Sequence, residues 1–150
     1  MAEKRLVPVL LVDDDDNDVV LFRRSLLHTG AAVRLITLSS GEAVLDYLSG
    51  KGPYADRRQH PLPQLVFLDA HLPQTPGARV LEFIKSSRTL AVVPVIILTG
   101  ALSPADTLKL YQLGANAICL KPLTPSQMDS FVSALCRFWV ESTLPPPASE

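Results

Sequence analysis

Five apolar segments alternate with five helix-like segments along this 150-residue chain, and this alternation restricts its fold more than any other feature. The apolar segments are rich in aliphatic and β-branched side chains and cover residues 6–12, 33–38, 65–68, 93–98 and 117–120. Helical patterns begin near residues 17, 39, 77, 103 and 124. Nearly continuous apolar strands joined by helices form parallel sheets that are buried on both faces. We therefore predict an α/β fold, a doubly wound sheet of five parallel strands in the common order 2-1-3-4-5, with helices on both faces.

Capping signals support the helical segments. Ser39 and Glu42 have the spacing of a capping box, and so do Thr124 and Gln127. Residues 50–63 read as a polar loop that is long for a connection in an α/β fold. The segments thus divide into strand–helix units, without signs of internal repeats or of a second domain.

The composition argues against several classes of protein. The net charge is −1 and there is no basic stripe, which gives a nucleic-acid role no electrostatic support. The apolar segments are far shorter than the roughly 18 residues of a membrane span, so no membrane partner is expected. Cys119 and Cys136 lack CxxC spacing, which indicates buried thiols of a cytoplasmic protein and not a disulfide framework or a zinc site. We expect one domain over residues 1–142, a disordered tail over 143–150 and no output domain.

Polar side chains end four of the five predicted strands. Asp13 and Asp14 follow the first strand, Asp69 the third, Thr99 the fourth and Lys121 the fifth. The carboxyl ends of parallel strands share one edge, where open α/β sheets bind their ligands, so these side chains should converge. Each residue alone has an ordinary structural explanation, such as a helix cap or a solvated surface lysine. Their combination at one edge predicts a functional site.

The acidic pair belongs to a run of four aspartates, residues 13–16. Two unit charges about 4 Å apart repel by roughly 4 kcal/mol at an effective dielectric of 20, so a cation should neutralise the cluster. A hard divalent ion such as Mg²⁺ suits these oxygen ligands. We expect Asp15 and Asp16 to form the acidic first turn of the next helix, where the helix dipole favours them. A lysine and a threonine suit the oxygens of a phosphoryl group, and a carboxylate can act as its acceptor.

Together, these residues resemble the receiver domain of two-component response regulators over roughly residues 6–139. The resemblance implies a flavodoxin-like fold, with Asp69 as the phosphoacceptor and with Thr99 and Lys121 as the residues that bind the phosphoryl group. It also implies a Mg²⁺ (or Mn²⁺) ion whose protein ligands are Asp13, Asp14, Asp69 and the backbone carbonyl of His71.

The sequence departs from this family at the conformational switch. Ile118, three residues before Lys121, occupies the position of the family's switch aromatic. An aromatic swing is therefore not expected, whereas the movement of Thr99 toward the phosphoryl group is. The resemblance further implies a cis peptide bond between Lys121 and Pro122.

A narrower resemblance is to the single-domain regulators that partner bacterial phytochromes. It rests on Asn17-Asp18, residues 41–48, residues 52–54 and Phe138-Trp139 followed by Leu144-Pro145. It implies an upstream sensor histidine kinase of the bacteriophytochrome kind. It also implies a homodimer formed through the last helix, with Phe138 and Trp139 as contacts. The simpler alternative is a core-facing helix, because one helical face holds Met128, Phe131, Val132, Leu135 and Trp139.

The function expected from these patterns is that of a single-domain response regulator in a phosphorelay. It would accept a phosphoryl group on Asp69 from a histidine kinase and signal by contacts with a downstream protein whose identity the sequence does not give. It would catalyse its own phosphorylation without turning over a separate substrate. One alternative is a pseudo-receiver that binds partners without phosphorylation. The other is a Mg²⁺-dependent aspartyl-phosphate phosphatase, which commonly needs a second acid where this chain has His71.

Overall fold

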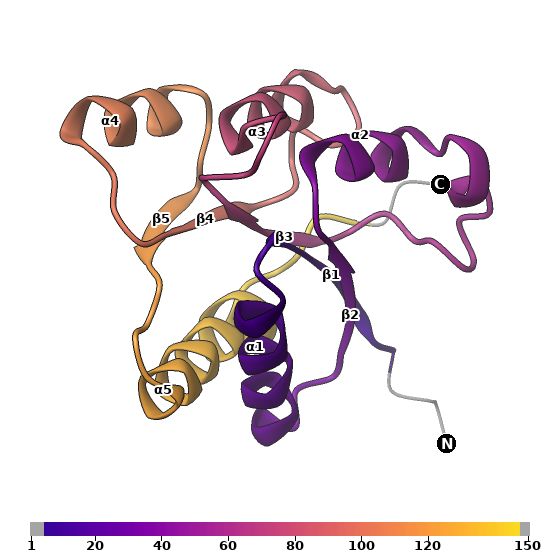
Figure 1. The fold of residues 1–150 in the computed structure, drawn as a ribbon. Coiled ribbons are helices and arrows are strands. Elements are labelled where there is room, and N and C mark those ends of the chain that lie inside the picture. Colours follow the sequence, from indigo (N-terminus) through magenta and orange to yellow (C-terminus); the bar gives the residue numbers. More distant parts are fainter. Residues whose placement is uncertain (1–4, 148–150) are drawn as a thin grey trace.

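The computed structural model describes residues 5–147 and contains one sheet of five parallel strands (Figure 1). The strands are β1 (Val7–Val12), β2 (Val33–Leu38), β3 (Leu65–Asp69), β4 (Val95–Thr99) and β5 (Ala117–Leu120). Their order is β2-β1-β3-β4-β5, and every neighbouring pair is parallel. The predicted fold class and strand order are therefore confirmed.

Helices cover both faces of the sheet (Figure 1). α1 (Asp16–Thr29) and α5 (Pro125–Leu135) lie side by side on one face, and α2 (Gly41–Ser49), α3 (Gly77–Ser86) and α4 (Pro104–Gln112) lie on the other. A short 3-10 helix, η1 (Gly52–Tyr54), follows α2, and a π-helical segment, η2 (Cys136–Ser142), continues α5. None of the helices within residues 5–147 is long and apolar enough to cross a membrane.

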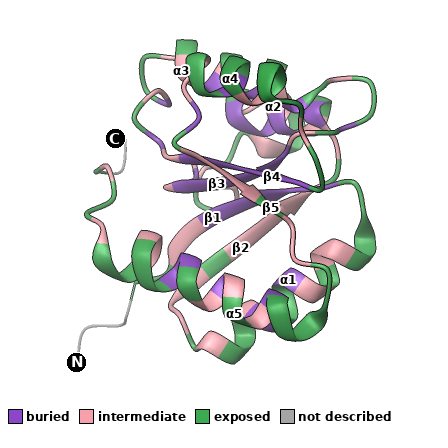
Figure 2. Cartoon of the chain, turned by 90° about the vertical axis from the view of Figure 1, so that its left-hand side faces the viewer, coloured by how far each residue is buried: buried purple, intermediate pink, exposed green. Residues whose placement is uncertain are grey.

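The core consists of two apolar layers separated by the sheet, and the buried strands lie between them (Figure 2). Successive side chains of β1 alternate between the layers. Leu10 and Val12 face the layer under α2 and α3, whereas Val9 and Leu11 face the layer under α1 and α5. Burial on both faces is why the strands read as continuous apolar runs, and it fixes which residues reach the carboxyl edge.

Side-chain caps set the starts of the helices, and one of the predicted caps is wrong. Ser40, not Ser39, is the N-cap of α2, because its hydroxyl accepts the Ala43 amide at 3.1 Å. The helix begins at Gly41, so the capping position is residue 40, and Ser39 lies one residue too early. Thr124 caps α5 as expected, with its hydroxyl 3.1 Å from the Gln127 amide.

Arg57 organises the long loop between α2 and β3. Its guanidinium donates to the backbone carbonyls of Tyr47 and Leu48, both at 2.8 Å, and so occupies the carbonyls that end α2. The Tyr47 hydroxyl donates to the Pro61 carbonyl at 2.7 Å, which ties the far end of the loop to the same helix. The loop therefore has a fixed path although it contains little regular structure.

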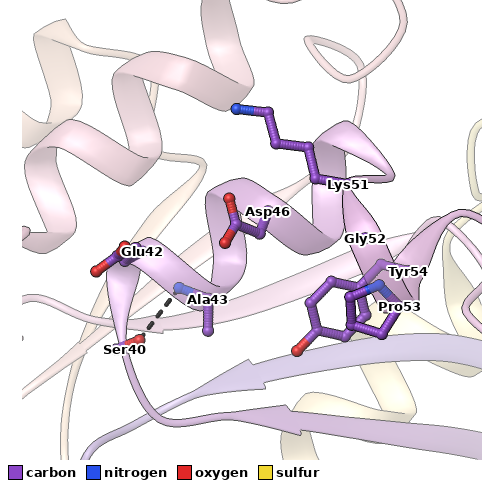
Figure 3. Close-up of a pocket in the computed structure, with 8 residues that line it drawn as sticks. All are labelled: Ser40, Glu42, Ala43, Asp46, Lys51, Gly52, Pro53 and Tyr54. Carbon is purple, nitrogen blue, oxygen red and sulfur yellow. Dashed lines mark hydrogen bonds between the residues drawn. The ribbon is translucent and has the colours of Figure 1, made fainter.

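An open pocket of about 430 Å³ lies between α2 and η1 (Figure 3). Its lining is mixed in charge and includes Glu42, Asp46, Lys51 and Tyr54. None of the polar residues that end the strands contributes to it. This pocket is therefore separate from the site predicted at the carboxyl edge of the sheet.

The last helix has the core-facing stripe that the sequence predicted, whereas the dimer contact through Phe138 and Trp139 stays a prediction. Met128, Val132 and Leu135 are buried in the core, as the helical stripe predicted. Trp139 packs partly against the same core layer, while Phe138 stays 57% exposed. Residues 143–147 follow η2, and residues 148–150 of the predicted tail lie outside the described residues. The domain limits and the disorder of the tail stay predictions.

Candidate functional site

The carboxyl edge of the sheet brings the predicted site residues together. Strand pairing aligns Asp69 with Leu98 and Thr99 with Leu120, so the ends of β3, β4 and β5 lie at one level. Asp13, Asp69 and Thr99 are buried, whereas Asp14 is exposed. These side chains come from segments up to 108 positions apart in the chain, which is the separation of Asp13 and Lys121.

The Lys121 ammonium group is the centre of the site. Its Nζ atom donates to Oδ2 of Asp13 at 2.9 Å, to Oδ2 of Asp69 at 2.9 Å and to Oδ2 of Asp18 at 3.0 Å. A lysine ammonium has three N–H donors, so all of them are used. The predicted convergence of Asp13, Asp69 and Lys121 is thus present as direct hydrogen bonds.

Backbone amides hold the other oxygen of each buried carboxylate. The Asp15 amide donates to Oδ1 of Asp13, and the His71 amide donates to Oδ1 of Asp69, both at 2.9 Å. In each case the donor lies two residues after the aspartate, which is the geometry of an Asx turn. The chain therefore turns sharply at the end of each strand, and both carboxylates are held with fixed orientations.

Burial and charge shift the ionisation of this cluster. Burial raises the pKa of Asp13 from 3.8 to about 6, although hydrogen bonds from Lys121 and the Asp15 amide lower it and Asp69 contributes to the rise. Burial would lower the pKa of Lys121, but its hydrogen bonds to three carboxylates raise it above the ordinary 10.5. The pKa values of Asp13 and Lys121 can both be raised because a single ammonium group is shared among several carboxylates. Lys121 therefore stays charged, and the site retains unbalanced negative charge.

Three of these acids fit a divalent cation. One carboxylate oxygen each from Asp13, Asp14 and Asp69 lies within 4.8 Å of the others. The donors are all oxygens, which suits a hard ion such as Mg²⁺ or Mn²⁺, and the exposed Asp14 gives access from solvent. The residues present therefore fit the cation that the sequence predicted.

The Thr99 hydroxyl donates to the carbonyl of Ala101 at 3.0 Å, in the loop after β4. The His71 imidazole reaches the same carbonyl oxygen, 3.0 Å from Nε2. Because a carbonyl can only accept, Nε2 carries the proton. The loops after β3 and β4 are thus joined at one acceptor, and the Thr99 hydroxyl donates to it.

The structure bears on two features expected near β5, the Lys121–Pro122 peptide bond and the position of Ile118. The bond between Lys121 and Pro122 is trans, and residues 5–147 contain no cis peptide, so the expected cis bond is wrong. A trans X–Pro bond is favoured by about 0.5–1 kcal/mol unless the surroundings select the cis form. Ile118 packs partly against the core layer under α2, α3 and α4.

The sequence interpretation missed two members of the site, the Asp18 carboxylate and the Ala101 carbonyl. Asp18 lies in the first turn of α1, which Asp15 caps by accepting the amides of Asn17 and Asp18. The available signal was an acid in the first turn after a strand-end pair, which is ordinary for a helix N-terminus. The Ala101 carbonyl carries no side-chain signal.

Residues 9–133 match the family of response regulator receiver domains. The chain is 31% identical over 140 residues to the response regulator Rcp1 of Synechocystis, and the alignment covers 93% of each. It is 33% identical over 135 residues to the probable methanogenesis regulatory protein FilR2 of Methanothrix harundinacea, covering 88% of this chain and 83% of FilR2. The crystal structure of the phosphorylated cyanobacterial phytochrome response regulator RcpA superposes with a TM-score of 0.88 at 29% identity, covering 95% of this chain and 99% of RcpA.

Proposed function

This chain belongs to the response regulator receiver domain family, and we propose that it accepts a phosphoryl group on Asp69 from a sensor histidine kinase. The observation that carries the proposal is the Lys121 ammonium group, 2.9 Å from both Asp69 and Asp13 beside a cluster of acids. Receiver domains are signalling proteins, and no separate substrate turnover is expected of this one. The alternatives of a pseudo-receiver and of a phosphatase have no specific observation in their favour.

In the proposed transfer, an Asp69 carboxylate oxygen attacks the phosphorus of a kinase phosphohistidine. A P–O bond forms, the P–N bond breaks, and the imidazole leaves with the electron pair of that bond. The His71 amide keeps the carboxylate oriented, and Lys121 offers its positive charge to the oxygens of the transferring group. A Mg²⁺ ion held by Asp13, Asp14, Asp69 and the His71 carbonyl would supply further neutralisation of their charge.

The switch that we propose starts from Thr99. The phosphoryl group adds about 1.5 to 2 negative charges to Asp69, which makes its oxygens strong acceptors. Thr99 then exchanges the Ala101 carbonyl for a phosphoryl oxygen, and the loop after β4 changes its preferred conformation. The scheme includes no aromatic swing, because the switch position holds Ile118, which is not aromatic and packs partly against the core. Output would follow through a protein contact made by the altered loop.

The proposed partners follow from the relatives. RcpA is described as a cyanobacterial phytochrome response regulator, which supports a phytochrome-type histidine kinase as the donor. FilR2, of similar identity, is described as a probable methanogenesis regulatory protein. Phosphoryl transfer from a panel of histidine kinases would therefore test which kinase is the donor. Transfer from a non-phytochrome kinase, with none from a phytochrome, would contradict this assignment. A cytoplasmic setting is proposed with it.

The central experiment is phosphoryl uptake from acetyl phosphate and Mg²⁺, measured by intact mass. Wild type should gain one phosphoryl group, and Asp69→Asn should gain none. Asp16→Asn is the matched control, because Asp16 is exposed in the same acidic run and accepts no hydrogen bond from Lys121 among the described residues. Undiminished uptake by Asp69→Asn would refute the assignment.

A homodimer through the last helix is proposed from the exposed Phe138 ring, which packs edge-on against Trp139 at 5.0 Å between ring centroids. Exposed aromatic pairs contribute strongly when buried at interfaces. Phe138→Ala should shift the protein toward monomer in light scattering, whereas Leu27→Ala, an exposed apolar change on α1, should not. A dimer that survives Phe138→Ala unchanged would remove this contact from the proposal.

A further inference from the structure

Lys121 donates to a third carboxylate that the proposed chemistry does not use. Asp13 and Asp69 belong to the group of acids that fits a cation, and Asp69 is the proposed phosphoacceptor. Asp18 is not a member of that group. Its side chain is 32% exposed, compared with 3% for Asp13 and 8% for Asp69, so it meets the lysine from the solvent side. The lysine is thus bound by the proposed phosphoacceptor, by a candidate cation ligand and by Asp18, which has neither role.

The position of Asp18 is fixed by α1. Its own amide donates to the Asp15 cap at 3.3 Å, which places the residue in the first helical turn. The positive end of the helix dipole favours a carboxylate there. α1 packs along α5, the element that follows the Lys121 loop, so the carboxylate is attached to a rigid support. Asp18 can therefore hold the lysine without moving itself.

The lysine needs such an anchor because its other two contacts change during phosphoryl transfer. Asp69 gives up carboxylate charge when its oxygen bonds to phosphorus, and Asp13 is shared with the cation cluster. A lysine side chain has four flexible methylene groups, and its ammonium is strongly hydrated. Without a fixed acceptor it would lose its position beside Asp69 as these contacts rearrange.

We propose that Asp18 is a positioning residue that anchors the Lys121 ammonium group beside Asp69, an inference that rests on the proposed phosphoryl transfer. It acts through Lys121 and touches no reacting atom. Its hydrogen-bonding oxygen matters more than its charge, because the lysine already faces two other carboxylates.

The test compares the initial rates of phosphoryl uptake from acetyl phosphate for wild type and variants at Asp18, Asp16 and Lys121. Asp18→Ala should slow uptake about 5- to 10-fold, the effect expected for one partly exposed hydrogen bond to a charged group. Asp18→Asn, which keeps an acceptor oxygen, should stay within about 2-fold of wild type. Asp16→Ala removes the same kind of first-turn charge and should leave the rate unchanged. In a Lys121→Ala background, Asp18→Ala should have no further effect.

Three results would overturn the anchor. They are a rate for Asp18→Ala equal to that of Asp16→Ala, equal losses for Asp18→Ala and Asp18→Asn, or a further loss in the Lys121→Ala background. A separate readout is the ammonium resonance of Lys121 in ¹⁵N NMR, which should be observable in wild type and should broaden in Asp18→Ala. If wild type takes up no phosphoryl group, the proposed function fails, and the resonance still decides whether Asp18 holds the lysine.

Discussion

Replacing Asp13 with Asn is expected to stabilise the protein in the absence of divalent cations. Asp13 is buried, and burial raises its pKa from 3.8 to about 6 even though Lys121 and the Asp15 amide donate to it. Ionised Asp13 is therefore tolerated less well in the folded state than in the unfolded state. An amide of the same shape carries no charge and avoids this cost.

The size and sign follow from proton linkage. A rise in pKa from 3.8 to about 6 corresponds to about 3 kcal/mol, since a tenfold change in an acid constant corresponds to about 1.4 kcal/mol. A group whose pKa is raised on folding stabilises the fold fully at pH values below its unfolded pKa. That stabilisation is lost as the pH rises through the folded pKa. The advantage of Asp13→Asn should therefore be about 3 kcal/mol at pH 7.5 and about 1 kcal/mol at pH 4.5.

The assay is urea denaturation in EDTA, followed by circular dichroism at both pH values. Asp16→Asn serves as the control, because Asp16 is exposed at the start of α1 and its loss should cost about 0.5 kcal/mol through the helix dipole. An Asp13→Asn protein that is less stable than wild type at pH 7.5 would refute the reasoning. So would an advantage that does not change with pH, because it would show that ionisation of Asp13 is not its source.

Three further changes probe the supports of the site. Gly77→Ala should destabilise the fold by about 2–3 kcal/mol in urea, because a Cβ there would overlap the backbone carbonyl of Asp69; no loss would mean that the turn can yield. Arg57→Ala should cost about 2 kcal/mol by removing the donor to the carbonyls that end α2, whereas exposed Arg58→Ala should change stability by less than about 0.5 kcal/mol; equal losses would contradict this role. His71→Ala should speed amide hydrogen exchange in the loop after β4, since that loop loses a hydrogen bond, and unchanged exchange would show that the imidazole does not restrain it.

The fold could be predicted because the same strand–helix pattern occurs five times along the chain. Each strand is a largely apolar run that ends at or just before a polar residue. Parallel pairing then brings those ends to one edge whatever the details of the loops. Lys121, Asp13 and Asp69 meet as hydrogen-bonded partners for that reason. The convergence depended on topology, which the alternation of elements determines.

Details of the site that depend on helix phase or on backbone groups could not be predicted. Asp18 is one of several acids near the start of α1, and only the helix start at Asp16 decides that it points to Lys121. The same uncertainty of one residue moved the cap of α2 from Ser39 to Ser40. The Ala101 carbonyl is a backbone group that every residue has, so no pattern of side chains could mark it.

The charge of the site connects its stability with its chemistry. Lys121 donates to Asp13, Asp18 and Asp69, and Asp14 joins Asp13 and Asp69 in the group of acids that fits a cation, so the ionised carboxylates outnumber the one ammonium group. Together with burial, this excess raises the pKa of Asp13, and in the proposed function it would also repel an anionic phosphoryl donor. A cation that joins the carboxylates removes both effects at once, whereas Lys121 alone is shared among too many acceptors to do so. If Asp69 accepts a phosphoryl group as proposed, the same unbalanced charge that destabilises ionised Asp13 in the fold would also be the charge that a bound cation offsets during the transfer.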